Sequence, residues 1–402
     1  MIRKGSLISW VRKIIQQRKE FPNPMKGILS AENNMIIKAF VQNQIENPNT
    51  FNSHISENDE MYLFALQHFK GDIDRACIEL LTTGKQSMDI MRQIAQWNFD
   101  GFANIAAMLD FAGGYGRLTR FLIQELLPQH IWVCDIYEDA VKFQQKQFGV
   151  HGIVSVRDPE DFESNKKYDC IFIASLFSHL PEREFIDWLK CLYNLLTPEG
   201  LLIFSVHDVG VLPPGLKMEE KGILFIPESE SRSLDMSDYG TTYVTESFVG
   251  TVIREITGEP RYYRKKRGLW WFQDVYIIAK NPNTNFRDLD LSPGPPGYVD
   301  RCILTDENQI LFEGWAADFS RDTFVKDIQI IVDGKLLKRC LPTDERPDIA
   351  AAFQDEKGLM SGFSCSIPRS IVRPSDIGIV KVTNSRNIEH VIRMGTLESM
   401  VS

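Results

Sequence analysis

One short segment gathers the residue types that suit close binding of a small ligand. It reads Met108-Leu109-Asp110-Phe111-Ala112-Gly113-Gly114-Tyr115-Gly116-Arg117. An apolar strand here ends in an acid and then in glycines, which tolerate positive φ and let a ligand approach the backbone. A pyrophosphate is one ligand of such turns, but Thr119 stands where the dinucleotide fingerprint needs a small residue, and Asp110 repels phosphate. The segment therefore favours a ligand without a pyrophosphate.

Further polar residues follow the next apolar runs. Asp135 ends the second run, where a carboxylate can accept hydrogen bonds from two ribose hydroxyls. Asp158 follows the third run, and the segment 168–181 contains a fourth run that leads into Ser178-His179-Leu180-Pro181. Asp135 and Asp158 could instead be simple helix caps, and this alternative stays open.

Taken in order, these motifs resemble class I S-adenosylmethionine-dependent methyltransferases over about residues 85–280. The stretch 196–204 resembles that family's turn into the fifth strand, and Ala112 stands where the family has its first glycine. The resemblance implies S-adenosylmethionine as cofactor, with its methionine part on the glycine-rich loop, its ribose on Asp135 and its adenine near Asp158. The cofactor-binding residues that it implies are Asp110, Ala112, Gly113, Gly114, Gly116, Arg117, Asp135, Ile136, Asp158, Ser175 and Phe177. Arg92 is a further candidate for the cofactor carboxylate, with a solvated helix face as the alternative.

Methyl transfer to a hydroxyl calls for a general base, and histidine suits neutral pH. His207 and His179 both follow expected parallel strands at their carboxyl ends, where ligands bind in such sheets. We rank His207 first and His179 second, with a structural role as the alternative for either. Asp208 follows His207, but neighbours on a strand point to opposite faces, so we do not expect the two to pair.

Two other segments are candidates for contacts with the acceptor. The insertion 209–240 interrupts the strand and helix pattern and is expected to cover the acceptor site, with Tyr239, Thr242 and Tyr243 as hydrogen-bonding groups. The basic run 261–267 suits a phosphate or a nucleotide-sugar diphosphate, with an exposed basic hairpin as the alternative.

The elements that must position these residues follow from hydrophobic periodicity. Continuous apolar runs alternate with helical segments over 105–280, which predicts a buried parallel sheet, and 274–279 would supply an antiparallel last strand. Residues 30–105 have helical periodicity that Thr83-Gly84 interrupts, which predicts separate helices on either side. Helices are also expected over 117–127, and after a cap at Thr245.

A Pro-Gly-rich stretch separates the strand and helix pattern described above from a second region, in which apolar residues alternate as in β-strands. Strand-like alternation over 327–332, a hairpin turn at Asp333-Gly334 and a helix at 347–353 are expected beyond it. Its motifs around Trp315 resemble a β-sandwich module found on bacterial enzymes of surface-polysaccharide synthesis, with Trp315 in the core. The predicted fold is α/β, with a Rossmann-like methyltransferase sheet that has an antiparallel last strand, an N-terminal helical cap and a C-terminal all-β sandwich domain. The predicted boundaries are 1–84, 85–281, 282–299 for the linker and 300–402.

Composition narrows the classes of function. The 402 residues carry a formal charge of −9, which argues against nucleic acid as a partner. Six basic residues and one acid stand in the first 20 positions, so this segment fits either a helix on an anionic membrane surface or one docked on the body. The seven scattered cysteines predict neither a disulfide framework nor a metal site, and no apolar run is long enough to span a membrane. We expect a cytoplasmic protein that contacts the membrane at most peripherally.

The sequence thus predicts an S-adenosylmethionine-dependent O-methyltransferase that acts on a hydroxyl of a sugar or glycan intermediate. Its acceptor would be free, nucleotide-linked or lipid-linked. The alternatives are a small-molecule O- or N-methyltransferase of secondary metabolism and a non-catalytic glycan-binding or scaffold protein.

Overall fold

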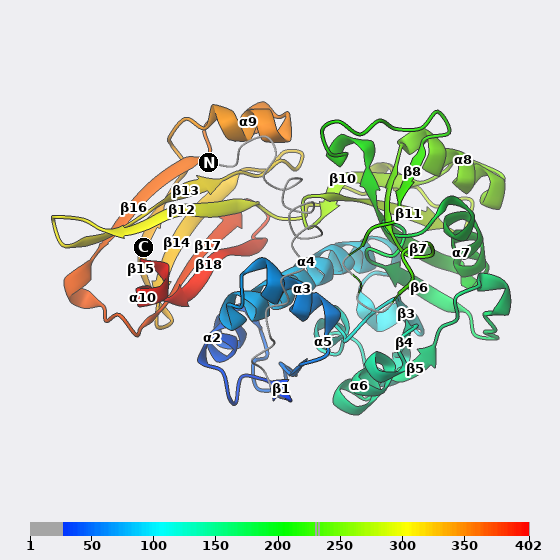
Figure 1. Ribbon diagram of the computed structural model, residues 1–402, viewed down its shortest axis with the longest axis horizontal. Helices are drawn as coiled ribbons and strands as arrows, with labels where there is room; N and C mark the ends of the chain where they lie inside the picture. The colour runs from blue at the N-terminus through cyan, green and yellow to red at the C-terminus, as the bar shows by residue number, and fades with distance from the viewer. Residues whose placement is uncertain (1–26, 230, 232–233, 402) are drawn as a thin grey trace.

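The computed structural model describes residues 27–229, 231 and 234–401. The amphipathic segment expected over residues 1–20 lies outside them. Figure 1 shows an α/β lobe and an all-β lobe, with the N-terminal helices α2, α3 and α4 between and below them. No helix in the described part of the chain combines the length and apolar character needed to cross a membrane.

The α/β lobe is built on one mixed sheet, and its main path runs β10-β11-β7-β6-β3-β4-β5. The strand bounds are β3 Met108–Phe111, β4 Ile131–Asp135, β5 His151–Val154, β6 Tyr168–Ile173, β7 Leu196–Asp208, β10 Tyr263–Leu269 and β11 Gln273–Ala279. Strands β3 to β7 pair in parallel, whereas β11 pairs with β7 in the antiparallel direction. This arrangement confirms the predicted Rossmann-like sheet with an antiparallel last strand.

Helices cover both faces of this sheet, and most of them lie where periodicity predicts. Their bounds are α6 Glu138–Phe148, α7 Glu182–Asn194 and α8 Glu246–Thr257, and Thr245 caps α8 through its side chain. The helix expected over 117–127 is wrong in length, because α5 spans only Thr119–Leu122. Beyond it the chain tightens, with the Gln124 N–H bonded to the Phe121 carbonyl and the Glu125 N–H to the Leu122 carbonyl.

The N-terminal region is helical, apart from a short pair of strands, β1 (Ile28–Leu29) and β2 (Ile55–Ser56). Its helices are α2 Met35–Gln44, α3 Glu60–His68 and α4 Ile73–Phe99. The predicted break at Thr83-Gly84 is wrong, because α4 is continuous through it. Gly84 serves packing instead: a Cβ there would lie 2.3 Å from the Arg117 carbonyl oxygen and 2.7 Å from the Phe121 ring. Helix α4 therefore packs tightly against the segment that follows the glycine-rich loop.

The C-terminal lobe has two antiparallel sheets that share one core. Their orders are β12-β13-β16 and β15-β14-β17-β18. The bounds are β12 Gly297–Leu304, β13 Gln309–Ala316, β14 Val325–Val332, β15 Lys335–Cys340, β16 Gly362–Pro368, β17 Ile377–Asn384 and β18 Glu389–Thr396, with helices α9 Pro347–Phe353 and α10 Leu397–Met400. Asp333 and Gly334 form the predicted two-residue turn with φ of 45° and 75°. Phe312 and Phe363 from one sheet pack with Ile328 and Val380 from the other, as expected for a sandwich.

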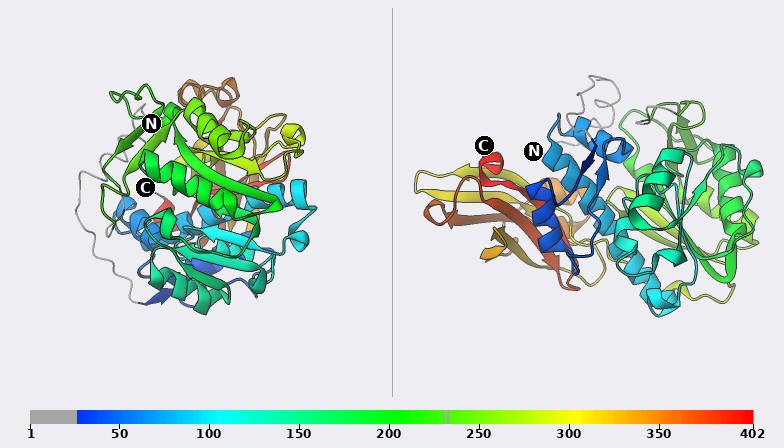
Figure 2. Two further views of the ribbon diagram at one scale, coloured as in Figure 1. Left: turned by 90° about the vertical axis from the view of Figure 1, so that its right-hand side faces the viewer. Right: turned by 90° about the horizontal axis from the view of Figure 1, so that it is seen from below.

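The two lobes are packed together rather than merely tethered. Ile331, Ile379, Val391 and Met394 of the four-stranded sheet belong to the same apolar core as α4. The Gln86 amide on α4 lies 3.0 Å from Nδ1 of His390 on β18. In Figure 2, the view from below shows the N-terminal helices lying between the sandwich and the mixed sheet.

Candidate functional site

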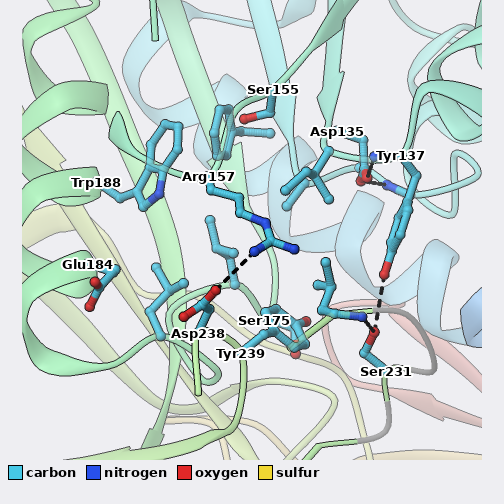
Figure 3. Close-up of a pocket in the computed structure, with 18 of the residues that line it drawn as sticks. Asp135, Tyr137, Ser155, Arg157, Ser175, Glu184, Trp188, Ser231, Asp238 and Tyr239 are labelled. Atoms are coloured by element: carbon cyan, nitrogen blue, oxygen red, sulfur yellow. Dashed lines mark hydrogen bonds and ion pairs between the residues drawn. The ribbon is translucent and has the colours of Figure 1, made fainter. Parts of the chain in front are cut away.

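A cavity of about 350 Å³ lies at the carboxyl ends of β3, β4, β5 and β6. That volume suits a small organic ligand, and this edge of an α/β sheet is where ligands bind. Figure 3 shows Asp135 and Tyr137 on one side of the cavity and Trp188 and Glu184 on the other. Of the residues that the sequence motifs predict for the cofactor, Ala112, Gly113, Gly114, Arg117, Asp135, Ile136, Asp158 and Ser175 line its wall.

The glycine-rich loop presents its backbone to this cavity. Ala112 has a φ of 55° and Gly114 a φ of 53°, and a Cβ at Gly114 would meet no atom within 4 Å. The loop is held from outside: Gln144 on α6 donates to the Gly114 carbonyl at 2.8 Å. A substituent at Gly116 would lie 2.4 Å from the Phe148 ring. Gly114 thus leaves room on the open side, while Gly116 permits packing behind the loop.

Asp135 fixes the loop to the end of β4. One carboxylate oxygen accepts the Gly114 N–H at 2.8 Å, and the other accepts the Tyr137 N–H at 2.9 Å. Burial raises the pKa of Asp135, and the backbone N–H groups that it accepts work against that rise. Asp158 also lines the wall while its side chain accepts the Glu160 N–H at 3.0 Å. Asp158 thus combines a capping role with a place at the cavity, whereas Asp135 is not the cap of α6, whose N-cap is Tyr137.

Three of the predicted cofactor residues lie behind the wall. Asp110 is 3% exposed and accepts a hydrogen bond from the Thr119 hydroxyl at 2.8 Å, and burial raises its pKa to about 7. Gly116 packs against α6 as described above. Phe177 corrects the prediction outright: it is fully buried and packs its ring against Phe185 and Phe204.

Arg117 and Arg92 differ sharply in setting. Arg117 lines the cavity with its guanidinium 4.0 Å from the centre of the Trp270 ring, and burial lowers its pKa to about 10. Arg92 pairs with Asp89 at 3.0 Å and Glu125 at 2.8 Å on the outer side of α4. Arg92 is not among the described residues that line the cavity, so its alternative reading as a solvated helix residue is the one that fits.

His179 lies directly behind the cavity wall, in contact with two residues that form it. Its ring stacks on Tyr239, with centroids 4.5 Å apart and planes 12° apart, and its Nε2 is 3.5 Å from the Ser175 hydroxyl. His179 Nδ1 is 2.7 Å from the Gly240 carbonyl. A carbonyl can only accept, so Nδ1 carries a proton and Nε2 of the neutral ring holds the lone pair that faces Ser175.

His207 is less accessible to the cavity. The Gln273 amide nitrogen lies 3.2 Å from its Nε2, and Tyr243 and Phe272 flank its ring. Burial lowers its pKa to about 3, and the nearby His179 adds to that effect. His207 is not one of the described wall residues. Asp208 bonds to Gly210 and pairs with Arg264, which agrees with the expectation that it does not pair with His207.

The insertion 209–240 reaches over the cavity, as expected for a cover. Five of its described residues contribute to the wall: Ser231, Leu234, Asp235, Asp238 and Tyr239. Figure 3 shows its two links to the opposite rim, where Tyr137 bonds to Ser231 at 3.1 Å and Arg157 pairs with Asp238 at 3.3 Å.

Two of the residues predicted to bind a polyol instead make contacts that stabilise the fold. The Thr242 hydroxyl donates to the Leu180 carbonyl and is fully buried, and Tyr243 is buried in the pairing of β9 (Thr241–Val244) with β8 (Ile223–Ile226). Of the three candidates, only Tyr239 reaches the wall.

Three cations of the basic run 261–267 have partners within the fold. Arg264 is held by Asp208, Glu246 and Asp274. Arg261 donates to the carbonyls of Thr284 and Asn281, and Lys265 pairs with Asp290. These three groups are already neutralised or hydrogen-bonded within the fold, whereas Lys266 is exposed and Arg267 lies over the Phe353 ring, so a phosphate contact by this run stays a prediction.

Several wall residues carry no sequence signal of their own. Asp59, Glu60 and Met61 come from the start of α3, and Glu184, Asp187 and Trp188 come from α7. Their identities are ordinary for helix starts and amphipathic helices, so only the packing of these helices against the sheet assigns them to the site. Among the residues that the structure describes, no three His, Cys, Asp or Glu side chains come together as a metal-binding group.

The sheet order, the antiparallel β11 and the glycine-rich loop at the end of β3 together define a Rossmann-like methyltransferase fold. Residues 109–202 match the family model described as a methyltransferase domain. This part of the chain is therefore similar to a methyltransferase domain.

Individual relatives are distant. Alpha N-terminal protein methyltransferase 1 of Dictyostelium discoideum is 32% identical over 107 residues, which cover 25% of this chain and 38% of that protein. The chain thus spans well under two thirds of this relative's length. Among solved structures, the plantazolicin methyltransferase BpumL with a pentazolic desmethylPZN analog and SAH has a TM-score of 0.38 at 17% identity, covering 54% of this chain and 95% of that one. N-methyltransferase NodS from Bradyrhizobium japonicum WM9 with S-adenosylhomocysteine has a TM-score of 0.34 at 12% identity, covering 50% and 88%.

Proposed function

We propose that the protein is an S-adenosylmethionine-dependent methyltransferase. The observation that carries this proposal is the cavity built from the glycine-rich loop, Asp135 and Asp158 in one wall. The residues fit the cofactor: open backbone at Gly114 suits the methionine part, and the acids at the ends of β4 and β5 suit the ribose and the adenine amino group. When bound, the cofactor supplies an electrophilic methyl group on a sulfonium, and the protein supplies alignment and a proton acceptor.

For the acceptor, we propose a hydroxyl of a sugar or glycan intermediate, with His179 rather than His207 as the base. Ser175 lines the cavity, and its hydroxyl faces the lone pair of His179 Nε2. The acceptor hydroxyl would lose its proton to the Ser175 oxygen while the Ser175 proton passes to Nε2, and the acceptor oxygen would then be able to take the methyl group that the cofactor supplies. The separation of 3.5 Å is long for a hydrogen bond, as is common for catalytic pairs before substrate binds.

The charge of the cavity wall favours an acceptor without phosphate. Glu184 and Asp235 add negative charge, while Arg157 and Arg183 are already paired with Asp238 and Asp187. A nucleotide-linked acceptor would bring its phosphates close to these acids. We therefore favour a neutral sugar hydroxyl over the nucleotide-linked form, in a cytoplasmic protein whose N-terminus touches the membrane at most peripherally.

The same acidic wall favours a second candidate, an amine acceptor on a small molecule or peptide. A cationic amine would be attracted to the wall, and after losing its proton it needs less help from a base. The Dictyostelium relative is named as a protein methyltransferase, which is compatible with this alternative.

Calorimetry with S-adenosylmethionine and S-adenosylhomocysteine tests the cofactor, and absence of binding would overturn the proposal. A mass screen for a methyl gain on neutral oligosaccharides, nucleotide sugars, lipid-linked glycans and amines then tests the acceptor. Methylation of a neutral sugar that depends on His179 supports the O-methyltransferase, whereas methylation only of amines, unaffected by His179→Ala, supports the second candidate.

A further inference from the structure

Asp59 is a buried acid whose side chain the fold leaves half satisfied. It lies at the N-cap of α3, where Oδ1 accepts the N–H groups of Met61 at 2.9 Å and Tyr62 at 3.2 Å. Its other oxygen, Oδ2, is buried and has no hydrogen-bond partner in the described chain, and the residue is only 2% exposed. Because a buried carboxylate oxygen without a donor is costly, such an atom at a cavity wall points to a ligand that supplies the donor.

A complementary charge faces the same cavity. The Arg117 guanidinium lies over the Trp270 ring, and its side chain makes no hydrogen bond or ion pair with any other residue in the described part of the chain. Burial raises the pKa of Asp59, with Arg120 and Arg117 opposing the rise, and Asp59 likewise works against the fall in the pKa of Arg117. The two groups are thus close enough to interact, yet each keeps hydrogen-bonding capacity for a third partner.

An opposed carboxylate and guanidinium match the zwitterionic end of an amino acid. We propose that Asp59 binds the α-ammonium group of the cofactor's methionine part through Oδ2, with Arg117 on the carboxylate side. This inference rests on the proposed function, because it takes S-adenosylmethionine as the ligand. The ammonium is a hydrogen-bond donor with a full positive charge, which suits the acceptor-only carboxylate.

The proposal makes the N-terminal helical region a part of the cofactor site. Asp59 lies outside residues 109–202, the segment that matches the methyltransferase family model, and outside the boundary at residue 85 that the sequence predicts for the domain. Helix α3 therefore supplies a recognition group for the cofactor as well as covering the sheet.

Calorimetry on the full chain tests the assignment with two ligands that differ only in the amine. These are S-adenosylhomocysteine and its deamino analogue, in which a hydrogen replaces the amino group. Asp59→Asn is the informative variant, because the asparagine oxygen still caps α3 while an amide NH₂ replaces Oδ2. We expect this variant to lower the affinity for S-adenosylhomocysteine roughly 10- to 100-fold and the affinity for the deamino analogue less than about threefold. Asp139→Asn is the matched control: it removes the same charge at the start of α6, outside the described wall, and should change both affinities less than about threefold.

The possible outcomes are separable. If the native protein binds neither ligand, the proposed function fails. If it binds both equally, the assignment of Asp59 fails, whatever the variant does, because the amine then has no receptor. Equal weakening of both ligands by Asp59→Asn would indicate a purely structural cap and would also overturn the assignment.

Discussion

A neutral histidine whose protonated nitrogen is fixed by a backbone carbonyl presents the lone pair of its other nitrogen in one direction. His179 meets this condition through Gly240, and its Nε2 faces the Ser175 hydroxyl at the cavity wall. We expect His179→Ala to lower kcat about 10²- to 10⁴-fold, the range for loss of a general base. Ser175→Ala should lower kcat to a similar extent, because the proton reaches His179 through this hydroxyl. Steady-state kinetics with saturating cofactor measures both.

His207 provides the comparison for that experiment. Its pKa is lowered to about 3 by burial, so it is a weak base, and we expect His207→Gln to retain activity within about tenfold. Loss of turnover in His207→Gln with retention in His179→Ala would reverse the assignment. Calorimetric titration with S-adenosylhomocysteine checks that each variant still binds cofactor.

Asp110 predicts a dependence of stability on pH. Burial raises its folded-state pKa to about 7, well above its ordinary value of 3.8, so the folded state holds a proton that the unfolded state releases. Its contribution to stability is therefore largest at low pH and is lost as the pH rises toward 7. Asp110→Asn has no such titration, and its stability relative to the native chain should rise by roughly 1–4 kcal/mol between pH 4 and pH 8. Chemical unfolding without cofactor at both pH values measures the difference, and parallel stabilities would contradict the prediction.

At the scale of elements, the contact between α4 and the segment after the glycine-rich loop depends on one missing side chain. Alanine in place of glycine in a solvated helix adds about 1 kcal/mol of stability. At Gly84 the new methyl group would overlap the Arg117 carbonyl and the Phe121 ring. We expect Gly84→Ala to destabilise the protein by roughly 1–3 kcal/mol and to weaken cofactor binding by moving Arg117. Urea unfolding measures the first effect and calorimetry the second.

The neighbouring Thr83 gives a matched control for that substitution. Its side chain is half-buried and donates to the carbonyls of Glu79 and Leu80 within the same helix, so Thr83→Ala should change stability by less than about 1 kcal/mol. If Gly84→Ala were as stable as the native chain, the prediction that stability depends on close packing of α4 against this segment would be wrong.

Gly84 also illustrates what sequence reasoning can and cannot reach. Strand identities, the antiparallel strand at β11 and the Asp333-Gly334 turn follow from local apolar runs and turn chemistry, and the structure has all of them. A glycine inside a helical pattern can indicate either a break in the helix or a close contact with another segment. Only the position of that segment in the folded protein distinguishes the two interpretations. The boundary predicted at residue 84 remains a prediction, although α4 runs through that position.

The residues of the candidate site also fall into two groups, those that the sequence could predict and those that it could not. The motif residues around Gly114 and Asp135 can be predicted because spacing along one strand, loop and helix unit carries the signal. Asp59 and Trp188 cannot, because they reach the cavity only through the tertiary packing of α3 and α7. Phe177 shows the opposite error: it adjoins the Ser175 position in sequence, yet its side chain points into the core.

At the scale of the whole molecule, the sandwich and the α/β lobe share an apolar core across α4. Val391 and Met394 on β18 are 5% exposed and pack in that common core, whereas Met400 packs within the sandwich alone. Removing residues 297–402 would uncover the side of α4 that carries Lys85 and Gln86, whose partners lie on β18. Gly84 of α4 packs against the backbone of Arg117, in the segment that follows the glycine-rich loop. The sandwich therefore supports the helix that in turn supports the cofactor loop.

We accordingly expect the full chain to unfold in one cooperative thermal transition, because separating the lobes exposes apolar surface from both. A chain of residues 1–296 should unfold at a lower temperature and bind S-adenosylhomocysteine more weakly. Met394→Ala in the full chain should cost roughly 2–5 kcal/mol and weaken that binding, whereas Met400→Ala should cost a similar amount without a direct effect on affinity under folding conditions. Calorimetric scanning and titration measure these quantities. Two separate transitions, with unchanged affinity in the shorter chain, would mean that the sandwich is an independent module whose contribution must be sought in its own surface.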